Sequence, residues 1–262
     1  MDNWIFYNDE FLPADKPVLQ AGNRLLQYGD GLFETMRVWN GRIVLEEYHF
    51  ERLYSGMQAL MLDGFNKDQW KDAVLRLCAK NELMPSSRVR LSVFRHRGII
   101  IESWPLESGY VFSADGFTLD VFQDVKKSID LLSQYKTAAY LPYALAAVFS
   151  RKHGFNDCLV TNAREMVCDS SIANVFCVKH GEVFTPSLNE GCINGVMRRH
   201  IMNHFPVKER SIDLTDISNA DEVFLTNVIR GVQPVTSFRE ANYQTAISSK
   251  IFETLVKPLT ER

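Results

Sequence analysis

The sequence predicts a two-domain protein that mixes α+β and α/β structure. The 262 residues suffice for two modest hydrophobic cores; the first part of the chain combines hairpins with amphipathic helices, and the second alternates helices with strands. Between the two parts, a strand-like segment gives way to charged residues. We therefore expect an N-terminal α/β domain over residues 1–122, a linker over 123–132 and a C-terminal α/β domain over 133–262.

Two hairpins open the expected first domain. Aromatic-rich runs at 4–7 and 11–12 flank a polar turn. A strand over 32–39 then leads through Asn40-Gly41 into a strand over 42–45. An Asn-Gly pair between apolar runs is a specific signal for a tight hairpin.

Two amphipathic helices and two further strands complete this domain. One helix begins at Glu46-Glu47, where acids suit the positive end of the helix dipole. The other covers 67–81. Strands are expected over 89–94 and 110–122. The expected buried faces are Leu53, Met57, Leu60 and Met61 on the first helix, and Trp70, Val74, Leu77 and Cys78 on the second.

The second half alternates helices with strands, a pattern typical of an α/β domain. We find no internal repeat or low-complexity tract in it. The expected helices cover 138–152, 196–204 and 246–256, and the expected strands cover 157–161, 172–178, 182–185 and 222–226.

The composition argues against several classes of protein. A formal net charge of −3 and a pI near 6.1 do not suit a nucleic-acid-binding surface. The longest aliphatic run, Ile99-Ile100-Ile101, is far shorter than the ~20 residues that span a bilayer. Five cysteines form an odd set without a C-x-x-C pair, which fits neither a disulfide framework nor a zinc site. We expect a cytoplasmic protein without a membrane segment or a nucleic-acid partner.

Two short segments resemble known binding motifs but lack a residue that each motif requires. Gly29-x-Gly31 continues to Glu34, where a dinucleotide-binding fingerprint has glycine. His200 and His204 lie four residues apart on an expected helix, but they lack the glutamate that follows the first histidine in zinc proteases. We expect no metal site.

Lys136 is a candidate nucleophile. It follows the apolar segment 129–132 and precedes an alanine-rich helix, so its surroundings can be dry. A desolvated lysine can lose its proton near neutral pH and attack a carbonyl group. The alternative is a solvated surface lysine, which is the commoner case.

Arg52 and Gly195 are candidates for anion binding. The guanidinium of Arg52 lies near the apolar stripe of its helix and matches phosphate oxygens in shape. A surface salt bridge to Glu47 or Glu51 is the alternative. Gly195 directly precedes an expected helix, whose free N–H groups and dipole attract anions.

Several separated blocks together resemble the class IV family of pyridoxal-phosphate (PLP) enzymes. They are Tyr28–Thr35, His49–Leu53, Lys136, Asp169–Phe176 and Gly191–Arg198, in the family's order and spacing. The resemblance runs from about Trp4 to Val235. The family includes branched-chain and D-amino-acid aminotransferases and 4-amino-4-deoxychorismate lyase. It implies fold type IV, as in D-amino-acid aminotransferase, with two α/β domains, PLP between the domains and a homodimer.

The resemblance implies a role for each block. Lys136 would hold PLP as an imine and move the substrate proton, Arg52 would bind the phosphate, and Asp169 would pair with the pyridine nitrogen. The other cofactor-binding positions that it implies are Tyr140, Gly195, Val196, Met197 and Asn227.

Asp169 departs from the family pattern. Relatives place a glutamate five residues before the asparagine that is Asn174 here, and aspartate is one methylene shorter. Aspartate can do the same electrostatic work through a water molecule or a small backbone shift. We interpret Glu165 as a turn residue and not as this partner.

The resemblance also places a substrate wall. Tyr28, Phe33 and Thr35 would lie on the strand that forms one wall of the pocket in relatives. Arginines near that wall are candidates for holding the substrate carboxylate, with Arg95 as our choice and Arg97 and Arg230 as alternatives.

Thr35 favours one member of the family. A hydroxyl at this point is typical of 4-amino-4-deoxychorismate lyase, where it assists proton transfer, whereas branched-chain enzymes usually have glycine. The segment 225–232 also lacks the hydroxyl-then-glutamate spacing of the aminotransferases. The resemblance thus implies release of pyruvate from 4-amino-4-deoxychorismate to leave 4-aminobenzoate, in the folate route. The alternatives are an aminotransferase that acts on branched-chain or D-amino acids with 2-oxoglutarate, and a PLP-binding module without turnover.

Overall fold

The computed structural model describes residues 3–261, which form two compact units. The first unit comprises the residues up to Gly109 together with Tyr135–Ala139, and the second comprises Tyr110–Gln134 and the residues from Tyr140 onward. This division differs from the expected linker over 123–132. The strand β7 (Phe117–Lys127) continues into that stretch and pairs with its neighbours, so its charged residues belong to a sheet of the second unit.

The sheet of the first unit has the strand order β2-β1-β6-β5-β3-β4 and antiparallel pairing. Both expected hairpins are confirmed. The pattern made no prediction for the strand β6, which contains the isoleucine run. The strands are β1 (Trp4–Tyr7), β2 (Glu10–Pro13), β3 (Gly31–Trp39), β4 (Arg42–Ile43), β5 (Ser86–Phe94) and β6 (Gly98–Pro105).

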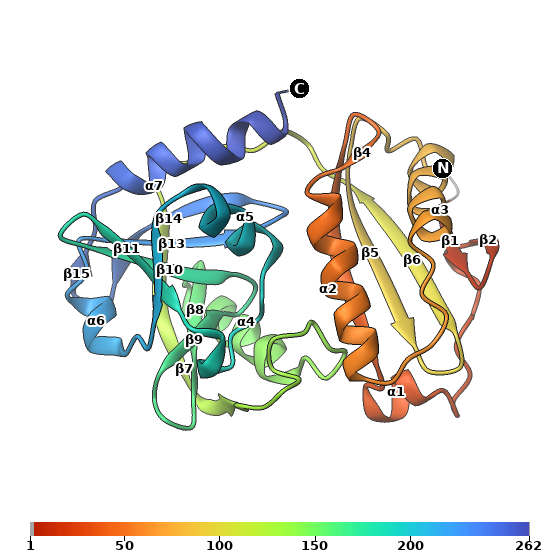
Figure 1. Ribbon diagram of the computed structural model, residues 1–262, viewed down its shortest axis with the longest axis horizontal. Coiled ribbons are helices and arrows are strands. Elements are labelled where there is room, and N and C mark those ends of the chain that lie inside the picture. Colours follow the sequence, from red (N-terminus) through yellow and green to blue (C-terminus); the bar gives the residue numbers. More distant parts are fainter. Residues whose placement is uncertain (1–2, 262) are drawn as a thin grey trace. The chain divides into compact units, whose positions relative to one another are not determined.

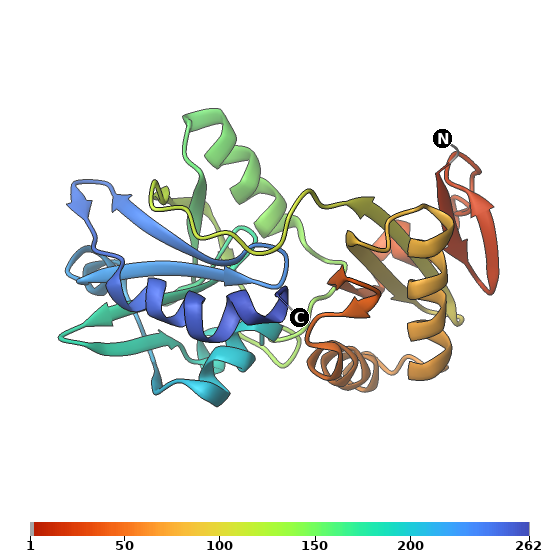
Figure 2. The same cartoon turned by 90° about the horizontal axis from the view of Figure 1, so that it is seen from above.

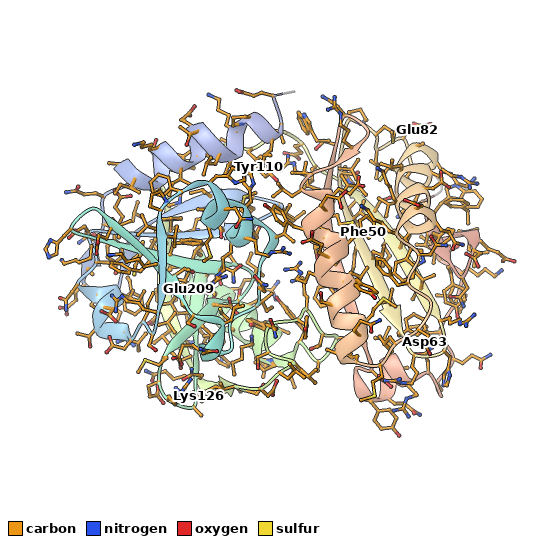
Figure 3. The ribbon with its side chains drawn as sticks, viewed as in Figure 1. Phe50, Asp63, Glu82, Tyr110, Lys126 and Glu209 are labelled. Carbon is orange, nitrogen blue, oxygen red and sulfur yellow. The ribbon has the colours of Figure 1, made fainter. Side chains whose placement is uncertain are left out.

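Two helices, α2 (Glu46–Ala59) and α3 (Lys67–Lys80), cover one face of this sheet (Figures 1 and 2). Phe50 of α2, labelled in Figure 3, is among the most deeply buried side chains. The expected buried face of α3 is confirmed. That of α2 is correct for Leu53 and Met57 but wrong for Met61, which is 81% exposed because the helix ends at Ala59 and Met61 adopts a left-handed conformation.

The sheet of the second unit has the strand order β12-β11-β10-β13-β14-β7-β8-β9. Strand β9 also pairs with β10, so the path of strands closes on itself, and β15 pairs with β14. Besides β7, the strands are β8 (Asp157–Asn162), β9 (Val167–Ser170), β10 (Asn174–Lys179), β11 (Glu182–Pro186), β12 (Val207–Arg210), β13 (Glu222–Asn227), β14 (Gly231–Phe238) and β15 (Ala241–Asn242).

Helices lie on both sides of this sheet, with α4 on one side and α7 on the other (Figure 2). None of the helices in the described part of the chain is both long and apolar enough to cross a membrane. All five cysteines are buried and free. The helices of the chain not yet given are α1 (Arg24–Tyr28), α4 (Leu141–His153), η1 (Leu188–Glu190), α5 (Val196–His204), α6 (Leu214–Ser218), α7 (Ala246–Ile251), the π-helical turn η2 (Phe252–Val256) and η3 (Lys257–Leu259).

Candidate functional site

Lys136 lies beside the start of β3, within the first unit. Its carbonyl oxygen accepts a hydrogen bond from the Phe33 N–H at 2.9 Å, and the Ala138 N–H donates to the Gly31 carbonyl oxygen at 2.9 Å. The side chain is half-buried, and its Nζ is 4.6 Å from the centre of the Phe33 ring. The structure therefore brings two of the expected site residues together.

Thr35 and Arg90 lie on the same face of the sheet as Phe33. Alternate residues of a strand share a face, and Thr35 pairs directly with Arg90 of β5. The guanidinium carbon of Arg90 is 3.8 Å from the centre of the Phe33 ring. We call Lys136, Phe33, Thr35 and Arg90 the Lys136 cluster. Arg90 was missing from the expected site because the pairing of β5 with β3, which places it there, is a long-range feature.

Arg95 makes contacts that hold a turn. Its guanidinium donates to both carboxylate oxygens of Asp30, at 2.8 and 3.0 Å, and to the carbonyl oxygens of Leu60 and Met61. The hydrogen bond from Arg95 lowers the pKa of Asp30, against the effect of burial. The donors of Arg95 are thus engaged by the protein itself.

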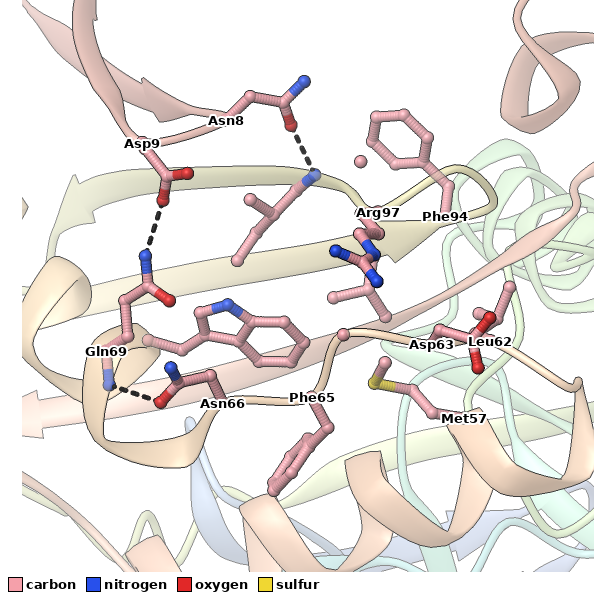
Figure 4. Close-up of a pocket in the computed structure, with 15 residues that line it drawn as sticks. Asn8, Asp9, Met57, Leu62, Asp63, Phe65, Asn66, Gln69, Phe94 and Arg97 are labelled. Atoms are coloured by element: carbon pink, nitrogen blue, oxygen red, sulfur yellow. Dashed lines mark hydrogen bonds between the residues drawn. The ribbon is translucent and has the colours of Figure 1, made fainter.

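Arg97 lines a hollow of about 400 Å³ in the first unit, shown in Figure 4. Met57, Trp70 and Val93 also line it. These three belong to the core on the helix-covered face of the sheet, whereas Phe33 lies on the opposite face. Arg97 is therefore not part of the Lys136 cluster. Arg230, the third candidate, is an exposed residue of the second unit, near the Phe117 ring.

Tyr28 is not on the expected strand. It ends the short helix α1, which the Asn23 side chain caps and which Gly29 terminates in a left-handed conformation. The side chain of Tyr28 is 66% exposed, and the Arg24 guanidinium lies over its ring. The sequence signal for this helix was present in the Asn23 cap and the Gly29 stop.

Arg52 is buried, and its hydrogen bonds identify a partner that we did not consider. Its Nε and Nη2 donate to the two carboxylate oxygens of Glu34, each at 2.7 Å, and His49 lies 2.6 Å from the same carboxylate. The alternative of a surface salt bridge to Glu47 or Glu51 is therefore wrong. Glu34 is on β3, one residue from both Phe33 and Thr35.

The Glu34 carboxylate is ionised at neutral pH. Burial acts to raise its pKa, but the charge of Arg52 and the hydrogen bonds from Arg52 and His49 outweigh burial and lower the pKa to about 2. Burial lowers the pKa of His49, so that its ring is neutral and donates through Nδ1. This buried group fixes the orientation of the Arg52 guanidinium.

In the second unit, the N-terminus of α5 carries three buried residues, Val196, Met197 and Arg198. The N-cap residue, Gly195, has no side chain to cap this helix, and the first N–H groups of a helix have no intrahelical acceptor. The preceding residue must be glycine, because a Cβ on Gly195 would lie 1.7 Å from Oδ1 of Asn174. A buried and uncapped helix start suits an anion.

Asp169 lies at the junction of β9 and β10, where it pairs with Asn174. Its Oδ2 accepts hydrogen bonds from the Tyr143 hydroxyl at 2.5 Å and the Ile193 N–H at 3.0 Å, and its Oδ1 accepts one from the Asn174 amide at 2.8 Å. The Nζ of Lys127 is 3.6 Å from Oδ2. Asp169 is 2% exposed, and no sequence pattern predicted these four contacts.

Two other expected positions lie at the ends of elements in the second unit. Tyr140 precedes α4 and stacks its ring on that of Tyr143 at 4.5 Å. Asn227 ends β13, and its Oδ1 accepts from the N–H groups of Ile229 and Arg230. The adjacent Thr226 carries a buried hydroxyl for which the described residues offer no hydrogen-bond partner. Thr226 pairs directly with Asn174, so an acceptor-rich ligand beside Asn174 would suit this hydroxyl.

Comparison with known proteins relates the chain to aminotransferases. D-alanine aminotransferase from Listeria monocytogenes is 26% identical, in an alignment that covers 88% of this chain and 86% of that protein. The structure of a branched-chain aminotransferase from Thermoproteus uzoniensis matches with a TM-score of 0.90 at 22% identity and covers 100% of this chain and 96% of that one. A structure from Legionella pneumophila, provisionally assigned as a 4-amino-4-deoxychorismate lyase, matches with a TM-score of 0.81 at 24% identity, over 92% and 96% of the two chains.

The two structural matches, at this level of identity, concern the fold. The model of the family described as "Amino-transferase class IV" matches residues 31–238, which include Lys136, Arg52, Asp169 and the turn before α5. This match covers most of the chain, and both units contain residues that it spans. The chain therefore belongs to the class IV aminotransferase family of PLP-dependent enzymes.

Proposed function

We propose that the protein is an aminotransferase that exchanges amino groups between a branched-chain or D-amino acid and 2-oxoglutarate. The observation that carries this proposal is the Lys136 cluster, in which an amine and a guanidinium lie against the same aromatic ring. An amine at this place can bond to an aldehyde and move a proton at the substrate α carbon. A guanidinium beside it suits the substrate carboxylate.

The residues present fit PLP. The buried, uncapped start of α5 and the unpartnered hydroxyl of Thr226 offer donors for the phosphate, and the fixed guanidinium of Arg52 offers a further cation. Asp169 offers the carboxylate for the ring nitrogen. When bound, PLP supplies the electron sink that stabilises negative charge on the α carbon.

Side chains of this protein would bind the substrate, orient it and move the proton. Lys136 would hold the cofactor through its amine, and the same amine, once released, would move the proton at the substrate α carbon. Phe33 shields the amine from water, and Arg90 orients the substrate through its carboxylate, so that the α hydrogen faces the lysine. We assign the carboxylate to Arg90 because its guanidinium lies over the same Phe33 ring as the Lys136 amine.

The choice of aminotransfer over lyase chemistry is supported by the identity of the relatives. The Listeria relative is a D-alanine aminotransferase, and its alignment covers most of both chains. The lyase is the second candidate, and Thr35 favours it, because a hydroxyl on the Phe33 face of β3 could protonate the carbon that leaves as pyruvate.

A direct comparison of substrates tests the proposal. Purified protein with PLP should convert D-alanine, L-leucine or L-isoleucine together with 2-oxoglutarate into glutamate and the matching 2-oxo acid. 4-Amino-4-deoxychorismate, assayed in parallel, should release little pyruvate. Rapid pyruvate release without aminotransfer would replace the proposal by the lyase. Absence of both reactions in a protein that binds PLP would contradict both.

A further inference from the structure

The surroundings of Asp169 contain a charge that the proposed function does not use. Lys127 at the end of β7 is 7% exposed and lies 3.6 Å from Oδ2 of Asp169. Its Nζ also donates to the carbonyl oxygen of Ser133 at 2.7 Å and to that of Gly191. The Lys127 amine is thus surrounded by two carbonyl oxygens and a carboxylate, and Lys127 and Asp169 form a buried ion pair.

The other titratable groups around Asp169 do not offset this pair. Burial, and then the charge of Asp169, raises the pKa of the Tyr143 hydroxyl on α4 well above its usual value. Burial raises the pKa of the Cys168 thiol on β9 and raises that of Cys192 to about 12. These three groups are neutral at physiological pH.

Glu190, a further buried carboxylate of the second unit, has its own partners. Glu190 of η1 pairs with Arg164 at 2.8 Å and accepts hydrogen bonds from Ser211 and Asn162. Among residues 3–261, Asp169 is the one carboxylate within ion-pair distance of Lys127. The charges of Asp169 and Lys127 therefore cancel locally.

We propose that Lys127 is the resident counter-ion of Asp169 and weakens the hold of this carboxylate on a proton at the ring nitrogen of the cofactor. This inference rests on the proposed binding of PLP. A carboxylate that faced the ring nitrogen alone would stabilise its protonated form strongly, whereas one already paired with an ammonium stabilises it less. Lys127 would thus set the strength of the electron sink.

The experiment measures the protonation of the ring nitrogen directly. Apo-protein is reconstituted with PLP that carries ¹⁵N in the ring, and the ¹⁵N chemical shift is followed against pH. In the wild type we expect the ring nitrogen to titrate within about pH 6 to 9, and in Lys127→Met we expect the titration to move up by about one to three pH units. The ring nitrogen should be protonated to a larger fraction in the variant, because the negative charge of Asp169 is then no longer balanced by Lys127.

Lys126 provides a matched control. It is the preceding residue of β7, it binds Glu165 and Thr161, and Figure 3 shows it at the periphery of the second unit. Lys126→Met should titrate like the wild type. Lys127→Arg keeps the positive charge and should also remain close to the wild type.

Each result decides the inference. Equal titration in Lys127→Met and the wild type would overturn it. If Lys127→Met fails to fold, the wild type alone decides, because a ring nitrogen that stays protonated throughout the range would also overturn it. A wild type that binds no PLP would instead contradict the proposed function. Failure of aminotransfer with a normal ¹⁵N titration would leave the role of Lys127 intact and contradict only the proposed reaction.

Discussion

The backbone of Lys136 is held by hydrogen bonds, and its side chain is half-buried. The hydrogen bond from Phe33 and the bridge between Leu32 and Thr137 hold its main chain against β3. Because the amine lies against Phe33, we expect borohydride reduction of the PLP-bound protein to attach the cofactor to Lys136. Peptide mass spectrometry identifies the labelled lysine. A label on Lys126 or Lys127 would contradict the assignment, and Lys136→Ala should carry none.

Thr35 distinguishes the two candidate reactions. Its hydroxyl lies on the same face of the sheet as Phe33 and Arg90. In the lyase reaction this hydroxyl would donate the proton to the departing carbon, whereas in the proposed aminotransfer the lysine would move the protons. Thr35→Val should therefore lower any pyruvate release from 4-amino-4-deoxychorismate by about tenfold to a thousandfold and change aminotransfer much less. Equal losses in both assays would show that Thr35 serves packing alone.

At the scale of elements, Glu34 of β3 pairs with Arg52 of α2, and the contribution of this contact to the free energy of unfolding depends on pH. The pKa of Glu34 is about 2 in the folded protein, against a usual value of 4.5. A lowered pKa contributes stability that is complete above the usual value and is lost as the pH falls toward the folded one. The contribution near pH 7 is about 3 kcal/mol and falls by about 2 kcal/mol by about pH 3.

Urea unfolding of the wild type and Glu34→Gln at both pH values measures this loss. The stability difference between the two proteins should be smaller at about pH 3, by about 2 kcal/mol, because protonation then removes the charge that the variant lacks. Glu51→Gln, which changes an exposed carboxylate of α2, is the control. A difference that is independent of pH would show that Glu34 is not ionised in the folded protein.

The turn before α5 depends on the absence of a side chain. A Cβ on Gly195 would collide with Asn174, which bonds both to Asp169 and to the Ile193 carbonyl oxygen. Gly195→Ala should destabilise the protein by about 1–3 kcal/mol, since these buried hydrogen bonds must break. Thermal unfolding and PLP titration measure the effect. Gly22→Ala, where the new Cβ meets nothing within 4 Å, should match the wild type.

Periodicity and turn signals in the sequence predicted the long helices and strands. They missed short strands that form only by pairing with neighbouring strands. Helix α5 begins at Val196 and ends at His204 as expected, because a glycine and an amphipathic pattern mark it. The short strand β9, Val167–Ser170, carries no alternating pattern, since all four residues are buried. Its existence depends on pairing with β8 and β10, which a local pattern cannot reveal.

The site residues show the same division. The blocks that resemble the class IV family predicted Lys136, Arg52 and Asp169 as candidate site residues, but not the residues that surround them. Glu34 is 18 residues from Arg52, and Tyr143 is 26 residues from Asp169. Arg90 joins Phe33 through strand register alone. Contacts of this kind follow from tertiary packing, so the sequence predicts the chemistry of the groups and not their charge balance.

At the scale of the whole molecule, the residues that we propose for catalysis and cofactor binding are divided between the two units. Lys136 and Arg52 belong to the first, and Asp169 and the start of α5 belong to the second. The segment Tyr135–Ala139 belongs to the first unit, although the chain enters the second on both sides of it. The backbone thus connects Lys136 on both sides to residues of the second unit.

We also propose that the protein is a homodimer. Leu26 and Tyr28 on α1 are each 66% exposed, and apolar side chains of this size are typical of the centre of an interface. The chain has a mass of 30.0 kDa. Sedimentation at micromolar concentration should give a species of about twice this mass, and a dilution series should reveal dissociation. A single species of one chain's mass at every concentration would contradict the proposal.

The burial of all five cysteines leaves the native surface without a thiol that reacts readily. Burial raises the pKa of Cys158 to about 11 and those of Cys177 and Cys192 to about 12, and it also raises those of Cys78 and Cys168. Thiolates are the reactive species, so these side chains should be inert toward maleimides while the protein is folded. A cysteine introduced at an exposed position such as Glu82 would then accept a fluorophore selectively, with no need to remove any natural cysteine.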